Sequence, residues 1–253
     1  MKSNIENDCL TAGESYQFPR HSLLYIKADH SGCDVWINTK DKDEKLCIER
    51  HDSGMLVLTP CMLTVDMGNL NCTRLDLPHL TKLQVFIDKA QNKKKDQNNR
   101  VWGYLSANLS MQPTTREIEY WFLNQSLANA DSIKSFSETL RNNEWYDLVE
   151  FLLEESCDSS TQRISALSQR YGLSVSHFRR LARRALGNTT KVEMRDWRLV
   201  RAILDLIESK SNNLTTIAMN HGYASLSHFS NEVKDAFGVS PRNLKNLYMR
   251  VDS

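Results

Sequence analysis

Four arginines in one short stretch are the side chains best suited to chemistry in this 253-residue chain. Arg179, Arg180, Arg183 and Arg184 are spaced so that they share one side of a helix. The planar guanidinium group donates paired hydrogen bonds to phosphate oxygens and to the O6 and N7 atoms of guanine. The pattern therefore predicts recognition of a nucleic acid, and the alternative is a charged face that contacts only solvent.

These arginines belong to a segment that occurs twice. YGLSVSHFRRLARRALG (Tyr171–Gly187) returns as HGYASLSHFSNEVKDAFG (His221–Gly238). The match continues upstream, where Ile164–Gly172 aligns with Leu214–Gly222 and apolar residues fall at the same positions. Each copy contains an apolar helical stripe, a glycine, a serine and a second stripe, which predicts helix, turn and helix.

The residues at the two turns have the types that this structure needs. Gly172 and Gly222 can adopt the positive φ with which a helix ends, and Ser174 and Ser225 can accept hydrogen bonds from the free N–H groups of the next helix. Two short helices joined in this way form the unit that places its second helix in the DNA major groove. The buried side of that second helix is expected to hold Phe178, Leu181, Ala182, Ala185 and Leu186 in the first copy and Phe229, Val233, Ala236 and Phe237 in the second.

The charge of the chain is divided between its two parts. Residues 1–162 hold 17 Lys and Arg against 24 Asp and Glu, whereas residues 163–253 hold 15 against 7, so the formal net charge of +1 averages two unlike segments. The basic segment contains the repeat. A polyanion is therefore expected to bind there, and the acidic segment limits non-specific binding to DNA.

The first part of the chain has the pattern of short strands, separated by Asp, Ser, Gly and Asn turn signals. We expect an α+β protein, in which residues 1–141 form a small β-rich domain with helices and residues 142–253 form an all-α domain. GMLVLTP resembles the signature of cupin-type sensor domains in a degenerate form. Strands are predicted at residues 22–28, 33–39, 45–49, 54–60, 62–67 and 72–77.

Helices are predicted at residues 79–91, 114–127 and 132–140, with a solvated lysine-rich loop at residues 92–99. Thr115 is expected to cap the second of these helices. Its apolar stripe of Ile118, Trp121, Phe122 and Gln125 has two open interpretations, which are packing in the core or contact with a second subunit or partner. The first domain is thus expected to regulate, dimerise or bind a partner.

The second domain is expected to contain seven helices with two helix-turn-helix units. A first scaffold helix is predicted at residues 144–155, followed by a loop at residues 157–161. The helix between the units, residues 191–209, would be about 28 Å long, close to the roughly 34 Å turn of B-DNA. It therefore has the length needed to place two recognition helices in successive major grooves. Ser240 and Pro241 begin the last helix, through about residue 248.

No residue pattern predicts a catalytic, metal or cofactor site. The six cysteines (Cys9, Cys33, Cys47, Cys61, Cys72 and Cys157) include no CxxC pair, and the seven histidines show no HExxH spacing. The segment MKSNIENDCLTAGESYQF has no apolar core typical of a signal peptide, and no run approaches the roughly 18 apolar residues that span a bilayer. A cytoplasmic, nucleoid-associated protein with reduced thiols and no membrane contact is expected.

The second half also resembles a known family. Residues 142–251, with two helix-turn-helix units bridged by a long helix and the ending GYASLSHFSNEVKDAFGVSPRNLK, are similar to the AraC/XylS family of transcription regulators. The first unit and the MRDWR segment resemble the InvF/MxiE-type activators of type III secretion genes. The resemblance implies virulence-gene activation at promoter DNA with RNA polymerase, and a secretion chaperone as co-activator.

The first turns of both recognition helices are expected to face the groove. Base contacts are predicted for Val175, Ser176, Arg179, Arg180, Leu226, Ser227, His228 and Asn231, and phosphate contacts for Arg183, Arg184, Lys234, Arg242 and Lys245. The second copy has Ser230, Asn231 and Glu232 in place of two arginines and a leucine, which predicts weaker attraction to DNA. The first unit should therefore supply most base specificity, while His177 and His228 can equally be structural residues near the turns.

Two other functions remain as alternatives. One is a regulator of a metabolic or stress operon that responds to a small molecule bound in the β-rich domain, in place of a chaperone. The other is an enzyme: the resemblance implies it because some relatives join this DNA-binding domain to a methyl-accepting cysteine module, and five of the six cysteines here lie in the first half. No activated Cys/His/Glu constellation supports the enzyme, so we expect none.

Overall fold

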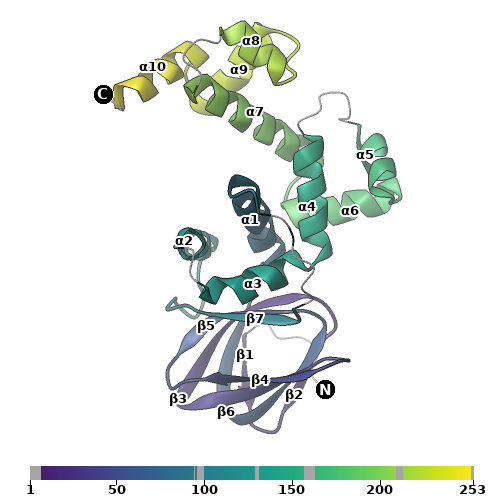
Figure 1. Cartoon of the computed structure of the whole chain (residues 1–253), viewed down its shortest axis with the longest axis vertical. Coiled ribbons are helices and arrows are strands. Elements are labelled where there is room, and N and C mark those ends of the chain that lie inside the picture. The colour runs from purple at the N-terminus through teal and green to yellow at the C-terminus, as the bar shows by residue number, and fades with distance from the viewer. Residues whose placement is uncertain are drawn as a thin grey trace. The chain divides into compact units, whose positions relative to one another are not determined.

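The computed structural model describes residues 7–93, 95, 100–128, 131–156, 163–208 and 213–251 (Figure 1). It contains two compact units, Met1–Asp147 and Leu148–Ser253. Their division falls inside helix α4 (Glu144–Glu155), six residues beyond the boundary predicted between residues 141 and 142. None of the helices in these residues combines the length and apolar character needed to cross a membrane.

The first unit is built on one seven-stranded antiparallel sheet. Its path is β1-β6-β3-β5-β7, with β2 paired to β6 and β4 paired to β3. The strands are β1 (Asn7–Thr11), β2 (Ser15–Phe18), β3 (Ser22–Asn38), β4 (Asp43–Ile48), β5 (Ser53–Leu58), β6 (Cys61–Leu75) and β7 (Trp102–Ser106). With the helices that follow, the sheet confirms the predicted α+β class.

Two long strands replace four of the predicted short ones. Residues 22–28 and 33–39 were expected as separate strands but form the single strand β3, and residues 62–67 and 72–77 likewise form most of β6. The pairing of β3 with β6 shifts register between Ala28 and Cys33, so the turn-type residues there make a bulge that bends the strands. A side chain at Gly68 would collide with the Gly32 carbonyl oxygen, which requires glycine at this crossing. The strands β1, β2 and β7 were not predicted.

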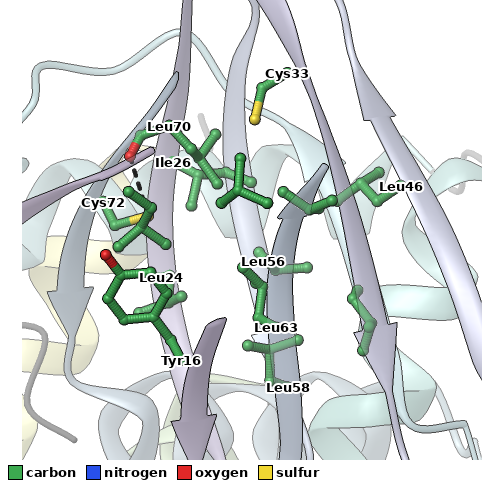
Figure 2. Close-up of a cluster of buried hydrophobic side chains, with 14 of the residues drawn as sticks. Tyr16, Leu24, Ile26, Cys33, Leu46, Leu56, Leu58, Leu63, Leu70 and Cys72 are labelled. Carbon is green, nitrogen blue, oxygen red and sulfur yellow. Dashed lines mark hydrogen bonds between the residues drawn. The ribbon is translucent and has the colours of Figure 1, made fainter. Parts of the chain in front are cut away.

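One face of the sheet encloses an apolar core (Figure 2). Alternate residues of β3, such as Leu24 and Ile26, point into it, together with Leu56 and Leu58 of β5. Tyr16 closes one side and is only 1% exposed. Because a β-strand alternates its side chains between two faces, the neighbouring residues of β3 and β5 must be covered on the opposite face.

Three helices cover that opposite face. They are α1 (Leu77–Ala90), α2 (Thr115–Leu127) and α3 (Ser132–Arg141), and α3 packs directly on β7. Burial on both faces explains why every residue of β5 is buried and why its pattern is continuously apolar. Thr114, and not Thr115 as predicted, caps α2, since its hydroxyl accepts the Glu117 N–H while the Glu117 side chain accepts the Thr114 N–H.

A buried carboxylate ties the helices of the first unit together. Asp88, at 1% exposure, accepts hydrogen bonds from Arg141 Nε and NH2 at 2.7 and 2.6 Å and from the Tyr146 hydroxyl at 2.9 Å. Gln84 donates a further bond at 3.0 Å. Asp88 lies on α1, Arg141 ends α3, and Tyr146 lies in the first turn of α4, so the network fixes where α4 begins.

The second unit is entirely helical in the residues that the structure describes. After α4 come α5 (Ile164–Tyr171), α6 (Val175–Leu186), α7 (Thr190–Glu208), α8 (Leu214–Asn220), α9 (Leu226–Phe237) and α10 (Pro241–Val251). These are the seven predicted helices, counted from α4. The predicted loop at residues 157–161, Cys157 and Ser209 lie outside the described residues, as do Lys94 and residues 96–99 of the lysine-rich loop.

Candidate nucleic-acid interface

The first helix-turn-helix unit consists of α5, a short turn and α6. Helix α5 ends at Gly172, whose φ of 81° is the left-handed conformation expected there. The Ser174 hydroxyl accepts the backbone N–H of His177 at 3.4 Å and caps α6. Ser168, 2% exposed, is small where the two helices cross. All five apolar residues predicted for the inner side of α6 are buried, and Gly187 ends the helix with a φ of 75°.

The outer side of α6 is strongly cationic. Ser176, Arg179, Arg180, Arg183 and Arg184 are exposed, while Val175 is half-buried. None of the four arginines pairs with a carboxylate among the described residues. A helix face with four guanidinium groups and no internal counter-ion attracts a polyanion and leaves all its donors available to it.

The second unit repeats the architecture with α8 and α9. The Asn213 side chain caps α8 by accepting the Thr216 N–H at 2.8 Å, and the Ser225 hydroxyl caps α9 by accepting the His228 N–H at 3.1 Å. Gly222 and Gly238 have φ of 71° and 73°. The predicted turns and caps are therefore confirmed in both copies.

The inner side of α9 departs from the prediction at its last turn. Phe229 and Val233 are fully buried, but Ala236 is exposed and Phe237 is 47% exposed. The core of this unit ends at Val233, with Leu244 of α10 packed against it. Sequence alignment could not reveal this, because burial at the end of a helix depends on which neighbouring element covers it.

The outer side of α9 is polar and less basic than that of α6. Ser227, Asn231 and Lys234 are exposed, and Arg242 is exposed on α10, whereas Lys245 is half-buried. Leu226 packs partly against the core of the unit, which reduces the surface that it can offer to a base.

His228 lies between a structural and a binding position. Its ring is about half exposed and meets the Tyr223 ring edge-on at 5.4 Å, and its Nε2 lies 3.7 Å from a Glu232 carboxylate oxygen. One side of the imidazole is thus held by the protein, while the other remains accessible.

Glu232 points into the protein and not toward a groove. Its side chain is 12% exposed and accepts a hydrogen bond from Arg198 NH2 at 3.2 Å, with Arg195 Nε at 3.9 Å. The Arg198 guanidinium lies 4.4 Å from the Tyr223 ring centre, and burial raises the pKa of Tyr223 to about 12. Glu232 therefore lies on the inner side of α9 and pairs with Arg198, while weaker attraction of DNA by this helix than by α6 stays a prediction. We call Arg198, Glu232 and Tyr223 the α7–α9 clamp.

The long helix α7 carries both units. It has 19 residues, which correspond to about 28 Å. Arg201 NH2 donates to the Ser156 carbonyl at the end of α4 at 2.7 Å, and Arg170 of α5 pairs with the buried Glu155 of α4 at 2.6 Å. The first unit is thus attached to α7 partly through α4, and the second through the clamp.

Lys191 is a candidate contact that the sequence analysis missed. Continuing the alignment past Gly187 and Gly238 places Thr189 on Ser240 and Lys191 on Arg242. Thr189 caps α7 by accepting the Val192 N–H at 3.4 Å, as Ser240 caps α10 by accepting the Asn243 N–H at 3.3 Å. The signal was present in the repeat, which extends farther than the segment first aligned.

The five cysteines that the structure describes are free thiols in the β-rich unit. Cys9 and Cys47 are exposed free thiols, and Cys33, Cys61 and Cys72 are buried free thiols. Burial raises the pKa of Cys33 to about 11 and that of Cys61 to about 12, which keeps both protonated. Within the described part of the chain, no three His, Cys, Asp or Glu side chains are grouped to hold a metal ion.

Comparison with known proteins assigns this arrangement to a family. A family model described as a helix-turn-helix domain matches residues 167–246. Invasion protein InvF of Salmonella typhimurium is 36% identical over 213 residues, which are 80% of this chain and 97% of InvF. Transcriptional regulator MxiE of Shigella flexneri is 44% identical over 108 residues, which are 43% of this chain and 51% of MxiE.

Among solved structures, that of ToxT from Vibrio cholerae O395 aligns with 96% of this chain and 96% of its own at 12% identity, with a TM-score of 0.36. The assignment depends instead on InvF, which is matched along nearly its whole length, and on the two matched helix-turn-helix units. The chain belongs to the AraC/XylS family of DNA-binding transcription regulators, in the group that includes InvF and MxiE, and it is not an enzyme.

Proposed function

We propose that this regulator activates type III secretion genes by placing α6 and α9 in successive major grooves on one face of promoter DNA. The observation that carries the proposal is the pair of capped helix-turn-helix units, of which the first presents four exposed arginines that pair with no carboxylate in the described part of the chain. Its similarity to InvF and MxiE supports the choice of target genes.

Base reading is assigned mainly to the first helix-turn-helix unit. Arg179 and Arg180 lie in the first two turns of α6, with Ser176 and Val175 beside them, where a recognition helix meets base edges. In α9 we assign this role to Ser227, His228 and Asn231, with a smaller contribution from the half-buried Leu226. Arginine supplies the bidentate contact to guanine that serine and asparagine cannot make.

Phosphate contacts are assigned to side chains farther from the groove floor. They are Arg183 and Arg184 of α6, Lys234 of α9, and Arg242 and Lys245 of α10. Contacts of this kind set register and affinity without reading sequence, and they make binding dependent on salt.

The test of sequence-specific binding compares Arg180→Ala with Arg184→Ala on a type III secretion promoter fragment and on a scrambled fragment. Arg180→Ala should weaken binding to the promoter by about 1 to 3 kcal/mol, at one base pair. Arg184→Ala should weaken both fragments alike and reduce the salt slope by about one unit. If Arg180→Ala also weakens both alike, the arginine does not read bases.

A protein co-activator fits the β-rich unit better than a small molecule. The side chains enclosed by the sheet are apolar and between 0 and 7% exposed, so they offer few polar groups to orient a ligand. We propose an acidic secretion chaperone as this partner, acting with RNA polymerase. Transcription from the promoter in vitro should require added chaperone, whereas full activity without it, or a copurifying metabolite that raises activity, would favour the small-molecule alternative.

Helix α2 offers a face for a second copy of the chain. Its inner residues Ile118 and Phe122 pack in the core, as one of the two earlier interpretations expected. Tyr120, Leu123 and Leu127 are 71, 37 and 71% exposed and follow the spacing of a coiled-coil seam. We propose that two α2 helices pair. Leu127→Glu should convert a dimer to a monomer in light scattering, while Arg116→Glu, at an exposed position one turn before Tyr120, serves as a charge control. A wild-type monomer would refute the pairing.

A further inference from the structure

A cavity of about 310 Å³ lies inside the helical unit, between its two helix-turn-helix units. Its lining includes Ile164 and Leu167 of α5, Lys191 and Arg195 of α7, and His228 and Glu232 of α9. It therefore joins residues of both units across the N-terminal half of the helix that bridges them.

The cavity has an excess of positive charge. Glu232 is its acidic residue, and Arg198 pairs with that carboxylate at 3.2 Å. Arg195 is 53% exposed, contacts Asp196 at 3.0 Å and lies 3.9 Å from Glu232. Lys191 is exposed, and within the described residues no carboxylate lies within 4.0 Å of it. After the clamp has neutralised Glu232, Lys191 remains to attract an anion, and the exposed Arg195, which bonds Asp196 through Nε and one Nη, keeps further N–H donors for it.

His228 connects the cavity with the first turn of α9. His228 lies in the first turn of α9, where a recognition helix meets the groove, and the same side chain lines the cavity. The cavity is therefore next to the reading face of α9. If α6 and α9 occupy successive major grooves, the DNA backbone between those grooves must pass the junction of the two units.

The repeat supplies an independent reason to place a phosphate there. Lys191 occupies in the first unit the position that Arg242 occupies in the second, two residues after the cap of the following helix. Arg242 lies in the first turn of α10, whereas Lys191 lines the cavity between the two helix-turn-helix units.

We propose that this cavity binds a phosphate of the DNA backbone between the two grooves, with Lys191 Nζ and the Arg195 guanidinium donating hydrogen bonds to its oxygens. The proposal rests on the two-groove docking given above as the function. It assigns contacts to two residues of α7, a helix otherwise expected to act only as a spacer, and it makes Glu232 and Arg198 the wall that keeps the site open.

The first test measures salt dependence with the full chain. Lys191→Gln and Arg195→Gln should each reduce the slope of log affinity against log salt by about 0.9 on a random-sequence duplex long enough for both units. Lys191→Arg should retain the slope, which separates lost charge from lost folding. Lys134→Gln, at an exposed lysine of α3, is the matched control and should change nothing. Unchanged slopes for both cavity variants would overturn the proposal.

The second test locates the phosphate. Single methylphosphonate linkages, which remove one backbone charge, are introduced across a duplex that the full chain has selected from random DNA. The wild type should lose affinity at one or two linkages between the half-sites, and Lys191→Gln should lose nothing further there while remaining sensitive at linkages beside α6. Equal losses for both proteins at every linkage would exclude the contact.

These tests also separate this inference from the function on which it rests. A wild type that selects one half-site in place of two, or binds no DNA, would refute the two-groove docking and the phosphate site together. Two-site selection with Lys191→Gln indistinguishable from wild type would refute only the phosphate site.

Discussion

The two helix-turn-helix units have the same turns and caps but use their charges in opposite ways. In α6 the position of Leu181 belongs to the apolar core, and all four arginines face outward. In α9 the equivalent position is Glu232, which faces inward and pairs with Arg198, while one exposed lysine remains on the outer side. A repeated architecture thus holds one helix by apolar packing and the other partly by a half-buried ion pair.

This difference explains why the units are suited to different tasks. Apolar packing leaves the charges of α6 free to contact DNA. In the α7–α9 clamp, the Glu232 carboxylate of α9 pairs with the Arg198 guanidinium of α7. This pair fixes the recognition helix to the bridging helix and leaves neither charge for DNA. We infer that the first helix-turn-helix unit supplies affinity and base reading, and that the second helix-turn-helix unit supplies register along the DNA.

The largest effect is expected from removal of one partner of the clamp. Glu232→Leu leaves Arg198, whose side chain is only 12% exposed, without its counter-ion and should cost about 3 kcal/mol in the free energy of unfolding. The double variant Glu232→Leu/Arg198→Leu should recover most of that loss, because no buried charge remains. Denaturant unfolding of the full chain measures both. A single variant as stable as the wild type would mean that α9 is held by its apolar contacts alone, as α6 is.

The last turns of the recognition helices provide the next comparison. Leu186 is 3% exposed and Phe237 is 47% exposed. Leu186→Ala should lower the free energy of unfolding by about 2 to 5 kcal/mol, since it leaves a cavity. Phe237→Ala should change it by less than about 1 kcal/mol. Similar losses in the two variants would indicate that another surface covers Phe237 in solution.

The groove faces can be made more alike by adding charge to the second unit. Asn231 corresponds to Arg180, and Asn231→Arg should increase affinity for random-sequence DNA and steepen the salt slope by about 0.9. Arg180→Gln should reduce the slope by a similar amount if that side chain also meets a phosphate, and should leave it unchanged if it contacts only bases. Titrations at several salt concentrations distinguish these results. No response to Asn231→Arg would mean that this side of α9 does not reach DNA.

The helix caps should show the smallest and most equal effects. Ser174→Ala and Ser225→Ala each remove one side-chain hydrogen bond at the start of a recognition helix, and each should cost about 1 kcal/mol in the free energy of unfolding. Threonine at either position should preserve most of the stability. A much larger cost at one position would show that the turns are less alike than their hydrogen bonds.

Much of the helical unit, Leu148–Ser253, could be predicted because its signals are local. A glycine that can take positive φ, a serine whose hydroxyl reaches an N–H three residues later, and apolar residues at helical spacing act within one or two turns of the chain. These signals located both turns and the bounds of α6 and α9 to within a residue or two. The exposed arginines followed directly, because a helix with one buried side presents the other.

In the β-rich unit the same reasoning misjudged features that depend on distant partners. Asp29–Gly32 has the composition of a turn, yet it forms a bulge because β6 pairs with β3 on both sides of it. Strand β7 is short and follows a long polar segment, and it is a strand because β5 offers it an edge. The Asp88 network joins residues more than fifty positions apart, a separation that no periodicity encodes.

The sequence by itself determined the two helix-turn-helix units, their caps, the order of their helices and the cationic face of α6, because each depends on residues close together in the chain. Only the tertiary structure decided that Glu232 turns inward, that Phe237 stays exposed and that Lys191 lines a cavity with His228. Those outcomes depend on which element lies opposite each side chain, and a buried charge is stable only where a partner such as Arg198 is already in place.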